Sequence, residues 1–414
     1  MLIYEIAVTI LFFVALPFIY AVRAVKGKYM YGWREKFGLL NVPKMSEKRI
    51  MFHGVSVGEV IALENVVKKA KETFPDYEII VTTGTKTGQD IAQKKYKDIA
   101  SFVTYFPYDI PCFVRSFLNK VKPSMVFIAE TELWPAFSYF CKKKNIPLFI
   151  INGRISDATF NSYKRFAFFF KQMLKNYTGV YTQSQIDNDK MISIGSNPET
   201  TKVMKNLKFD VKRTECDIQI GQEYGRIIIA GSTHAGEDEI VLSMFEFVKK
   251  EFPDAKLLLA PRHPQRVPQV EELVKLTELK YGLRSKNDTF ENNDIIILDT
   301  LGELGKMYSI CDIAFIGGSF NKTGGHNPLE ATVYDKPTIT GPSIHNFRDI
   351  YWLLSQSSAG KIVQNGDELT AYIKKLMGDK EFYNQACADC KTVFTEQQGA
   401  LDFVINRIKE EIGV

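Results

Sequence analysis

Short apolar runs alternate with longer amphipathic stretches along most of the chain. The runs are rich in Val, Ile and Phe, which predicts buried β-strands, and the stretches between them predict helices. This alternation is typical of parallel sheets built from β-α-β units. The predicted strands are residues 49–55, 78–83, 101–106, 125–129, 147–152 and 179–182 in the first half, and 226–230, 256–260, 294–298, 313–317, 337–340 and 361–363 in the second. We therefore expect an α/β fold with two doubly wound domains.

A polar stretch at 211–223 lies between the two halves and predicts a linker. We expect one Rossmann-like domain over 49–210, a second over 224–380, and a helical tail over 381–414. Ligands of doubly wound sheets bind beyond the carboxyl ends of the strands. The predicted site is therefore a cleft between the two domains, lined by the loops at those strand ends.

The N-terminal segment is apolar and then basic. Residues 1–22 carry Glu5 as their one charge, which predicts an uncleaved transmembrane anchor. A cleaved signal peptide is the alternative, but it should begin with basic residues and end at a small-residue cleavage site. The cations that follow would place the rest of the chain in the cytoplasm. The segment 23–48 mixes those cations with aromatic residues, a composition typical of the lipid headgroup zone. It could bind an acidic, membrane-borne substrate there, or it could only hold the domain on the bilayer surface.

The charge of the remaining chain is balanced. Of the 414 residues, the first 50 hold eight Lys or Arg against three Asp or Glu, and the other 364 hold 45 of each. A neutral body argues against nucleic-acid binding, which needs a basic face. Six cysteines show no regular framework, and the pair Cys387 and Cys390 has no second Cys or His pair nearby to complete a zinc site.

Polar side chains follow the first predicted strand in HGVSVGEV, residues 53–60. Ser56 and Glu59 have the spacing of a capping box, in which the carboxylate bonds back to the start of a helix. Glu59 could equally be a general base at the floor of the cleft. The spacing alone leaves both roles open.

Two carboxylates, Glu130 and Glu132, follow the fourth strand in AETELWP, where burial is costly unless they bind something. Asn152, Arg154 and Ser156 follow the fifth strand in NGRIS and offer donors to a phosphate or to sugar hydroxyls. Arg154 could equally neutralise Glu130 or Glu132.

The strongest pattern of the second half is GGSFNKTGGHNPLE, residues 317–330. Asn327 as N-cap and Pro328 at the first helical position predict a helix start that seats a phosphate. Arg262 and His263 of APRHPQR would add charge-assisted bonds. Glu330 is ambiguous, because a capping carboxylate cannot also bind a ribose.

Other motifs bear on which cofactors are expected. Neither G-x-x-x-x-G-K-[ST] nor G-x-G-x-x-G occurs, which argues against a nicotinamide enzyme. All five histidines are expected in loops at strand ends, and Ser232 lies beside one of them in GSTHAGE. The triplet at 187–189 contains two aspartates, but residues two apart on a helix point in different directions, so we expect no metal site.

Taken in order, SVGE, ETELWP, N-x-R-x-S, NLKFD, PRHP-x-R, DT-x-GEL and GGSF…GGHN-x-LE resemble the motifs of the 3-deoxy-D-manno-octulosonic acid (Kdo) transferases of lipopolysaccharide inner-core synthesis. The resemblance covers nearly the whole chain. It implies a GT-B fold, in which two Rossmann-like domains face a cleft, and an inverting glycosyltransferase that needs neither metal nor cofactor. The implied donor is CMP-Kdo, and the implied acceptor is the lipid A precursor lipid IVA. The implied location is the inner membrane, where a single-pass chain contacts the membrane lipids and keeps its catalytic domains in the cytoplasm. No nucleic-acid partner is expected.

The resemblance also assigns roles to individual residues. Glu59 resembles the proton acceptor, and Glu130 and Lys208 resemble groups that stabilise the transition state. The residues that resemble the CMP site are Pro261, Arg262, Leu301, Gly302, Glu303, Asn327, Pro328, Leu329 and Glu330. Further candidates in the cleft are Glu132, Asn152, Arg154, Ser156, Ser232 and His263.

Two positions depart from the family pattern. Lys205 precedes Asn206 where Gly is common, and Ala136 follows ELWP where Asn is common. Two alternatives to a Kdo transferase are considered. One is another GT-B nucleotide-sugar transferase of lipid A or peptidoglycan synthesis, and the other is a two-lobed sugar-binding protein without catalysis.

Overall fold

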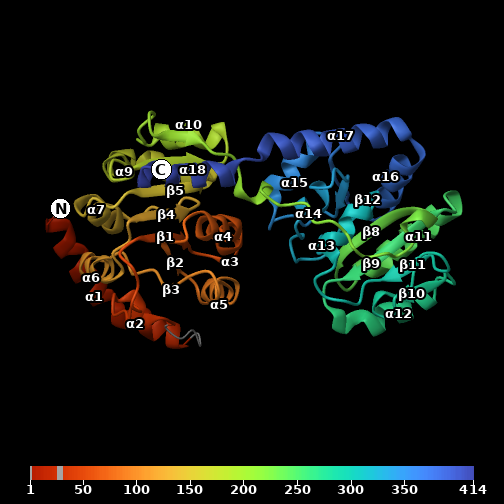
Figure 1. Cartoon of the computed structure of the whole chain (residues 1–414), viewed down its shortest axis with the longest axis horizontal. Helices are drawn as coiled ribbons and strands as arrows, with labels where there is room; N and C mark the ends of the chain where they lie inside the picture. Colours follow the sequence, from red (N-terminus) through yellow and green to blue (C-terminus); the bar gives the residue numbers. More distant parts are fainter. Residues whose placement is uncertain (1, 26–30) are drawn as a thin grey trace. The chain divides into compact units, whose positions relative to one another are not determined.

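The computed structural model of the chain describes residues 2–25 and 31–414. The chain forms two compact units, one of Met1–Asp210 with Gln398–Val414 and one of Val211–Gln397. Each unit contains a seven-stranded sheet (Figure 1). All the strand pairs are parallel, as the alternation of short apolar runs with helical stretches predicts.

The sheet of the first unit has the strand order β3-β2-β1-β4-β5-β6-β7. The strands are β1 (Arg49–Gly54), β2 (Glu78–Thr83), β3 (Phe102–Tyr105), β4 (Met125–Ala129), β5 (Leu148–Gly153), β6 (Gly179–Thr182) and β7 (Thr201–Val203). The chain reverses its direction of travel across the sheet between β1 and β4, and the crevice at such a reversal is where doubly wound folds bind ligands.

Helices cover both faces of this first sheet. The two-residue period of β1 sends Ile50 and Phe52 into the core under α3, α4, α5 and α18, and Met51 into the core under α6, α7, α9 and α10. The helices of this unit are α1 (Leu2–Val25), α2 (Trp33–Lys36), α3 (Val57–Ala62), α4 (Glu64–Thr73), α5 (Lys86–Lys95), α6 (Pro111–Val121), α7 (Pro135–Lys143), α8 (Asp157–Arg165), α9 (Ala167–Leu174), α10 (Gln185–Ser193) and α18 (Ala400–Ile412).

The sheet of the second unit has the order β10-β11-β9-β8-β12-β13-β14, with its reversal between β8 and β12. Its strands are β8 (Arg226–Thr233), β9 (Ala255–Pro261), β10 (Tyr281–Leu283), β11 (Ile295–Ile297), β12 (Ile313–Ile316), β13 (Thr338–Thr340) and β14 (Gly360–Ile362). Its helices are α11 (Glu237–Glu251), α12 (Val267–Lys275), α13 (Leu304–Met307), α14 (Leu329–Thr332), α15 (Arg348–Ser355), α16 (Gly366–Gly378) and α17 (Lys380–Gln397). One core lies under α11, α12 and α16, and the other under α13, α14 and α15.

Two segments lie differently from their expected roles as linker and tail. Ile218 and Ile220 of the expected linker are buried in a core of the second unit, and Arg213 forms an ion pair with Asp335. The C-terminal helices divide between the units, because α17 belongs to the second unit and α18 packs into the core of the first.

The N-terminal helix α1 packs on the first unit through Phe12, whose ring contacts the rings of Phe37, Tyr108 and Phe113. Within residues 2–25 and 31–414, no helix is both long enough and apolar enough to cross a membrane. The expected transmembrane anchor at 1–22 is therefore not confirmed. Residues 26–30 of the expected basic, aromatic segment lie outside the described residues.

Candidate functional site

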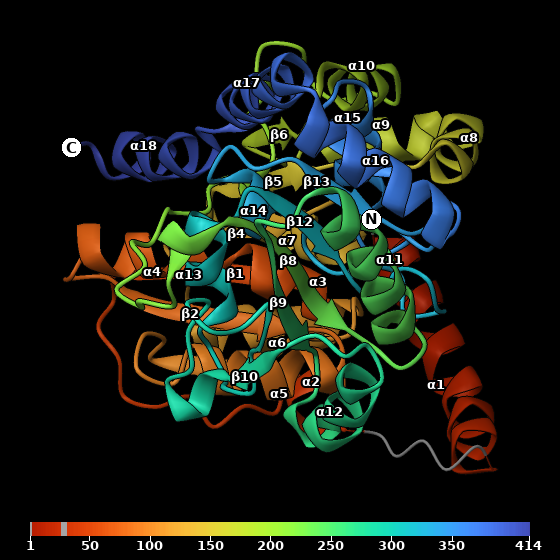
Figure 2. The same ribbon diagram turned by 90° about the vertical axis from the view of Figure 1, so that its right-hand side faces the viewer.

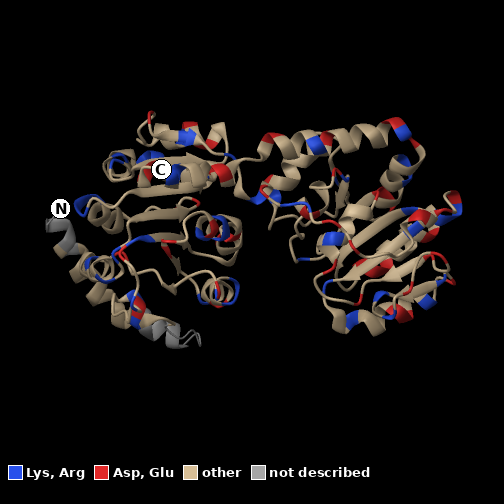
Figure 3. Ribbon diagram, in the orientation of Figure 1, with Lys and Arg blue, Asp and Glu red and all other residues tan. Residues whose placement is uncertain are grey.

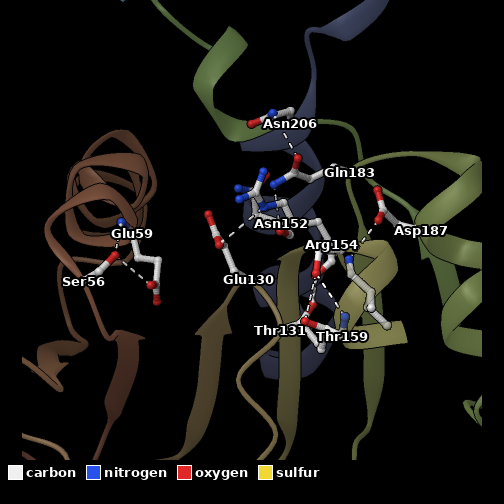
Figure 4. A network of polar contacts seen from close by, with 12 residues as sticks. Ser56, Glu59, Glu130, Thr131, Asn152, Arg154, Thr159, Gln183, Asp187 and Asn206 are labelled. Carbon is white, nitrogen blue, oxygen red and sulfur yellow. Dashed lines mark hydrogen bonds and ion pairs between the residues drawn. The ribbon is translucent and has the colours of Figure 1, made fainter. Parts of the chain in front are cut away.

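Glu59 lies in the first turn of α3, directly after the carboxyl end of β1, and its side chain is 7% exposed. One carboxylate oxygen accepts a hydrogen bond from the Val55 amide at 2.7 Å. The other accepts one from the Ser56 hydroxyl at 2.8 Å, which Figure 4 shows. The Ser56 hydroxyl in turn accepts from the Glu59 amide, so the capping box is formed. Burial raises the pKa of Glu59 against the opposing effect of these bonds. Both oxygens keep free lone pairs, so the cap does not exclude a role as a base.

Glu130 follows β4 with a positive φ of 55°, and its amide donates to the Ile151 carbonyl. Its carboxylate lies 3.7 Å from Nε of Arg154 (Figure 4). The structure therefore pairs Arg154 with Glu130, one of the two partners that the sequence left open. A left-handed backbone is strained for a residue with a side chain, and such strain concentrates at functional sites.

Glu132 lies two residues further on, on the same loop. Its pKa is raised to about 7, first by burial and then by the negative charges of Glu59 and Glu130. The ends of β1 and β4 thus bring three carboxyl groups within electrostatic reach of one another, at the reversal point of the first sheet.

Asn152 lies near the carboxyl end of the neighbouring strand β5 and is fully buried, with a positive φ of 55°. Its side-chain oxygen accepts from the Leu207 amide at 3.0 Å, and its carbonyl accepts from the side chain of Gln183 at 3.1 Å. Gln183 also accepts from the side chain of Asn206, which in turn caps the short turn Leu207–Phe209 that carries Lys208 (Figure 4). This network fixes the Lys208 turn to the ends of β5 and β6. The side-chain nitrogen of Asn152 has no hydrogen-bond partner within the described residues.

Ser156 and the aspartates at 187–189 have local structural roles. Ser156 caps α8 by accepting from the Thr159 amide. Asp187 accepts from the Ile155 amide and from the Ser184 hydroxyl, and Asp189 accepts from Gln185. Among the described residues, no group of three or more His, Cys, Asp or Glu side chains is placed to hold a metal ion.

In the second unit, the loops after β8 and β12 are joined by Glu237, which is fully buried. Its carboxylate accepts four backbone hydrogen bonds of 2.7–2.9 Å, from the amides of His234, Gly318, Ser319 and Phe320. Glu237 is not among the candidate residues predicted from the sequence. The three-residue spacing from His234 was a signal for a local cap, but not for the three bonds to the distant loop.

Two histidines face each other beside this carboxylate. Nε2 of His234 lies 2.9 Å from Nε2 of His326, and the ring of His263 lies 5.7 Å from that of His234. Burial and nearby Arg262 lower the pKa of His326 to about 4, and burial lowers the pKa of His234. The pair is therefore neutral near pH 7, with one ring nitrogen donating and the other accepting. His53 differs from expectation, since it lies within β1 and is fully buried, where its pKa is lowered to about 3.

The segment at Asn327–Glu330 forms a shorter helix start than the sequence suggested. The side chain of Asn327 accepts from the Leu329 amide, but α14 has four residues and its N-cap is Pro328. So short a helix has a small macrodipole, which weakens the predicted phosphate seat. Burial raises the pKa of Glu330, while Asn327 and Arg262 oppose this shift, so Arg262 lies within electrostatic reach of both Glu330 and His326.

The loop before α13 carries Leu301, Gly302 and Glu303. Leu301 is exposed, and Gly302 has a positive φ of 84° with open space where a Cβ would lie. Glu303 accepts from the Thr300 hydroxyl and from the guanidinium of Arg284. Leu301 is therefore accessible from solvent, while the bonds of Glu303 fix the loop. In β8, Ser232 is buried with a positive φ of 58°, at an irregularity in the pairing of β8 with β9 two residues before His234.

Comparison with known proteins shows which family the chain resembles. Residues 31–211 match the family described as 3-deoxy-D-manno-octulosonic-acid transferase (kdotransferase). The chain is 32% identical over 392 residues to the 3-deoxy-D-manno-octulosonic acid transferase of Haemophilus influenzae, and the alignment covers 92% of each chain. The chain belongs to the Kdo transferase family. It is accordingly a glycosyltransferase that acts in Kdo transfer during lipopolysaccharide synthesis.

A further relative differs from this Kdo transferase in length, and a solved structure of similar fold differs from it in sequence. A bifunctional glycosyltransferase/methyltransferase of Fusobacterium nucleatum is 34% identical over 380 residues, and the alignment covers 88% of this chain but 59% of that one. The solved structure of the UDP-GlcNAc 2-epimerase of Neisseria meningitidis aligns with a TM-score of 0.56 at 12% identity and covers 87% of this chain and 100% of the other. That likeness shows the GT-B-type fold alone.

Within this Kdo transferase, each unit gathers its own candidate residues. The first unit brings Glu59, Glu130, Glu132, Asn152 and Arg154 to the carboxyl ends of β1, β4 and β5. The second unit brings Arg262, His263, His326 and Glu330 to the loops beyond β8, β9 and β12.

Proposed function

We propose that this Kdo transferase moves Kdo from CMP-Kdo to lipid IVA with inversion and without a metal ion. The observation that carries the proposal is the group of three carboxyls at the reversal point of the first sheet, one of which, Glu59, is buried with a raised pKa. A base of raised pKa can take a proton from a sugar hydroxyl near neutral pH.

In the proposed reaction, the acceptor hydroxyl oxygen attacks the anomeric carbon of Kdo, and the bond from that carbon to the phosphate oxygen of CMP breaks. The hydroxyl proton passes to Glu59, and CMP leaves with the bonding electrons. A single displacement inverts the anomeric centre. Lys208, on the turn held by Asn152 and Asn206, and Glu130, on its strained backbone, would stabilise the transition state.

The donor nucleotide would bind in the second unit. Arg262 supplies a cation that offsets the growing charge on the leaving phosphate, which is the work that a metal does in other transferases. Pro261, the loop Leu301–Gly302–Glu303 and the segment from Asn327 through Leu329 to Glu330 would enclose the cytidine and ribose. The open space beside the backbone of Gly302 permits close approach of a ligand.

Attachment to the inner membrane is also proposed. The apolar residues 1–22 would hold the chain on or in the bilayer, with both units on the cytoplasmic side, because the cations follow the apolar segment. Lipid IVA would then be taken from the same leaflet.

The test is a transfer assay with the full chain, CMP-Kdo and lipid IVA, followed by mass spectrometry of the lipid. We expect the lipid to gain the mass of Kdo, and we expect activity to persist in a chelator. Transfer from a UDP-sugar instead of CMP-Kdo would favour the other GT-B transferases, and binding of sugars without any transfer would favour a non-catalytic role. A strict requirement for Mg²⁺ would contradict the metal-independent step.

A further inference from the structure

Helices α8 and α9 of the first unit carry an unusual exposed surface. Phe166, Phe168 and Phe169 are 62%, 81% and 42% exposed. Large apolar side chains that lie close together on a surface usually mark a contact with a partner or a membrane. We call these three residues, together with the neighbouring Lys164, Arg165, Lys171 and Lys175, the α8–α9 surface.

The core of the unit does not require these phenylalanines. In α9 the residues that pack inward are Met173 and Leu174, and α8 contains no buried residue. Phe170 differs from its aromatic neighbours, because it packs against the core and its ring lies tilted on Tyr163, with the ring centroids 4.2 Å apart. Phe169 contacts Phe170 edge-on but remains 42% exposed. Phe166, Phe168 and part of Phe169 therefore remain as apolar area exposed to water after folding.

The charge around these rings is of one sign. Residues 158–175 contain four cations and no acidic residue. Asp157, at the start of α8, is paired with Lys190 at 2.7 Å. Lys and Arg on the ribbons of this region appear in blue in Figure 3. Exposed aromatic rings surrounded by unopposed cations are complementary to a bilayer with anionic headgroups, and a uniformly basic rim disfavours pairing with a second copy of the same surface.

The α8–α9 surface lies on the same face of the first sheet as α1. The residues of α6, α7 and α9 share one core, and Phe12 of α1 packs on Phe113 of α6. Figure 1 shows α1 and α9 on the side of this sheet away from α4 and α5, and Figure 2 shows α8 beside α9. The exposed side chains of α1 include Phe13, Val14 and Phe18, so one face of the unit presents two separate apolar surfaces.

The surface also adjoins the candidate acceptor residues. Ser156, which caps α8, is two residues from Arg154, and Arg154 is paired with Glu130. A bilayer in contact with α8 and α9 would therefore lie next to the loop that carries the carboxyl cluster.

We propose that the α8–α9 surface is a second bilayer contact, separate from residues 1–22, in which the phenylalanines enter the interface of an anionic membrane and the cations bind lipid phosphates. Its place beside Arg154 gives it a role in presenting a lipid acceptor, and that role rests on the proposed function, whereas the bilayer contact itself does not.

The direct test places a reporter in the full chain. Phe168→Trp is compared with Phe247→Trp, an exposed position on α11 of the second unit, and the emission of the unsubstituted chain is subtracted from both. We expect vesicles of phosphatidylglycerol and phosphatidylethanolamine to shift the emission of the Phe168→Trp reporter to shorter wavelength, and brominated acyl chains to quench it. The Phe247→Trp reporter should not change. Emission from Phe168→Trp that is the same with and without vesicles would overturn the proposal.

A second measurement tests the phenylalanines and separates the remaining outcomes. The triple variant Phe166→Ser, Phe168→Ser, Phe169→Ser should keep its melting temperature and its activity on a water-soluble, short-chain acceptor. Its kcat/KM for acceptor in anionic vesicles should fall roughly tenfold or more, because three apolar side chains no longer leave water. If instead the unsubstituted chain is a dimer in detergent-free buffer and the triple variant a monomer, the surface is a contact between copies and the bilayer contact is wrong. The emission of the Phe168→Trp reporter could shift with vesicles while the chain transfers no Kdo. That result would support the bilayer contact and contradict the proposed function.

Discussion

At the scale of single residues, Glu59 has a structural role as a helix cap and a proposed chemical role as the general base. Its carboxylate completes the capping box of α3, and its pKa is raised by burial. The two roles respond differently to substitution, because a cap needs an acceptor oxygen and a base needs a site for a proton.

Glu59→Gln keeps one acceptor oxygen and the size of the side chain but cannot accept a proton at neutral pH. We expect kcat to fall roughly a hundredfold or more with little change in melting temperature. Glu59→Ala should also lose about 1 kcal/mol of unfolding free energy, the usual cost of a lost cap. A Glu59→Gln enzyme with near-normal kcat would exclude this carboxylate as the base and direct attention to Glu130 or Glu132.

Glu132 predicts a pH dependence of stability. Because its pKa in the folded state, about 7, is raised above the ordinary value of 4.5, its contribution to stability is present below pH 4.5 and is lost as the pH rises to 7. Glu132→Gln should therefore be more stable than the unsubstituted chain at pH 8, by about 1–2 kcal/mol after allowance for partial exposure, and the difference should vanish near pH 4.5. Urea unfolding at pH 4.5, 6, 7 and 8 measures this, with the exposed Glu72→Gln as control. An equal difference at every pH would show that the pKa of Glu132 is not raised.

Arg262 tests the proposed donor site. Arg262→Ala should weaken CMP binding by about 1.5–3 kcal/mol, the range for a hydrogen bond to a charged group. Calorimetry with CMP measures the change, and Lys250→Ala, an exposed cation on α11, serves as the matched control. Equal CMP affinities of the two variants would remove Arg262 from the site.

At the scale of elements, the sequence predicted the strands well because each central strand is a continuous apolar run. The two strands that it missed, β7 and β10, have three residues each and lie in polar surroundings at or near a sheet edge, so local pattern carries little signal for them. The candidate residues followed from their positions after strands. The pairing of Arg154 with Glu130 and the three bonds of Glu237 to residues 318–320 could not follow, because they depend on which loops the sheet order makes neighbours.

Glu237 is the link between the loops after β8 and β12, and its removal should be expensive. Glu237→Ala leaves four amide donors, two of them buried and two partly buried, without their acceptor, so we expect a loss of at least about 3 kcal/mol of unfolding free energy. Glu239→Ala, an exposed position two residues away, should change stability by less than about 0.5 kcal/mol. Similar losses in both variants, measured by urea unfolding, would show that the four bonds are not what holds the loops.

At the scale of the whole molecule, the chain passes between its two units twice, after Asp210 and after Gln397. Hydrogen bonds join the two crossing segments, because the Asp210 carboxylate accepts from the amides of Gly399 and Leu401 at the start of α18. The last helix is therefore part of the first unit although it follows the second in sequence. The sequence could not show this, since the periodicity of 381–414 predicts helix without a partner.

Ile408 tests this arrangement because it is fully buried in the core under α4 and α18. Ile408→Ala should destabilise the first unit by about 2–5 kcal/mol, the cost of a cavity in a packed core. Since the second unit has separate cores, CMP affinity measured by calorimetry on the folded chain should stay unchanged, and hydrogen exchange should quicken in β1 and β4 but not in β8 and β12. The exposed Glu410→Ala on the same helix controls for effects on helix propensity, because it changes no buried contact. Faster exchange in β8 and β12, or weaker CMP binding, would mean that α18 supports the second unit as well, and the division of the chain into two independently stabilised units would be wrong.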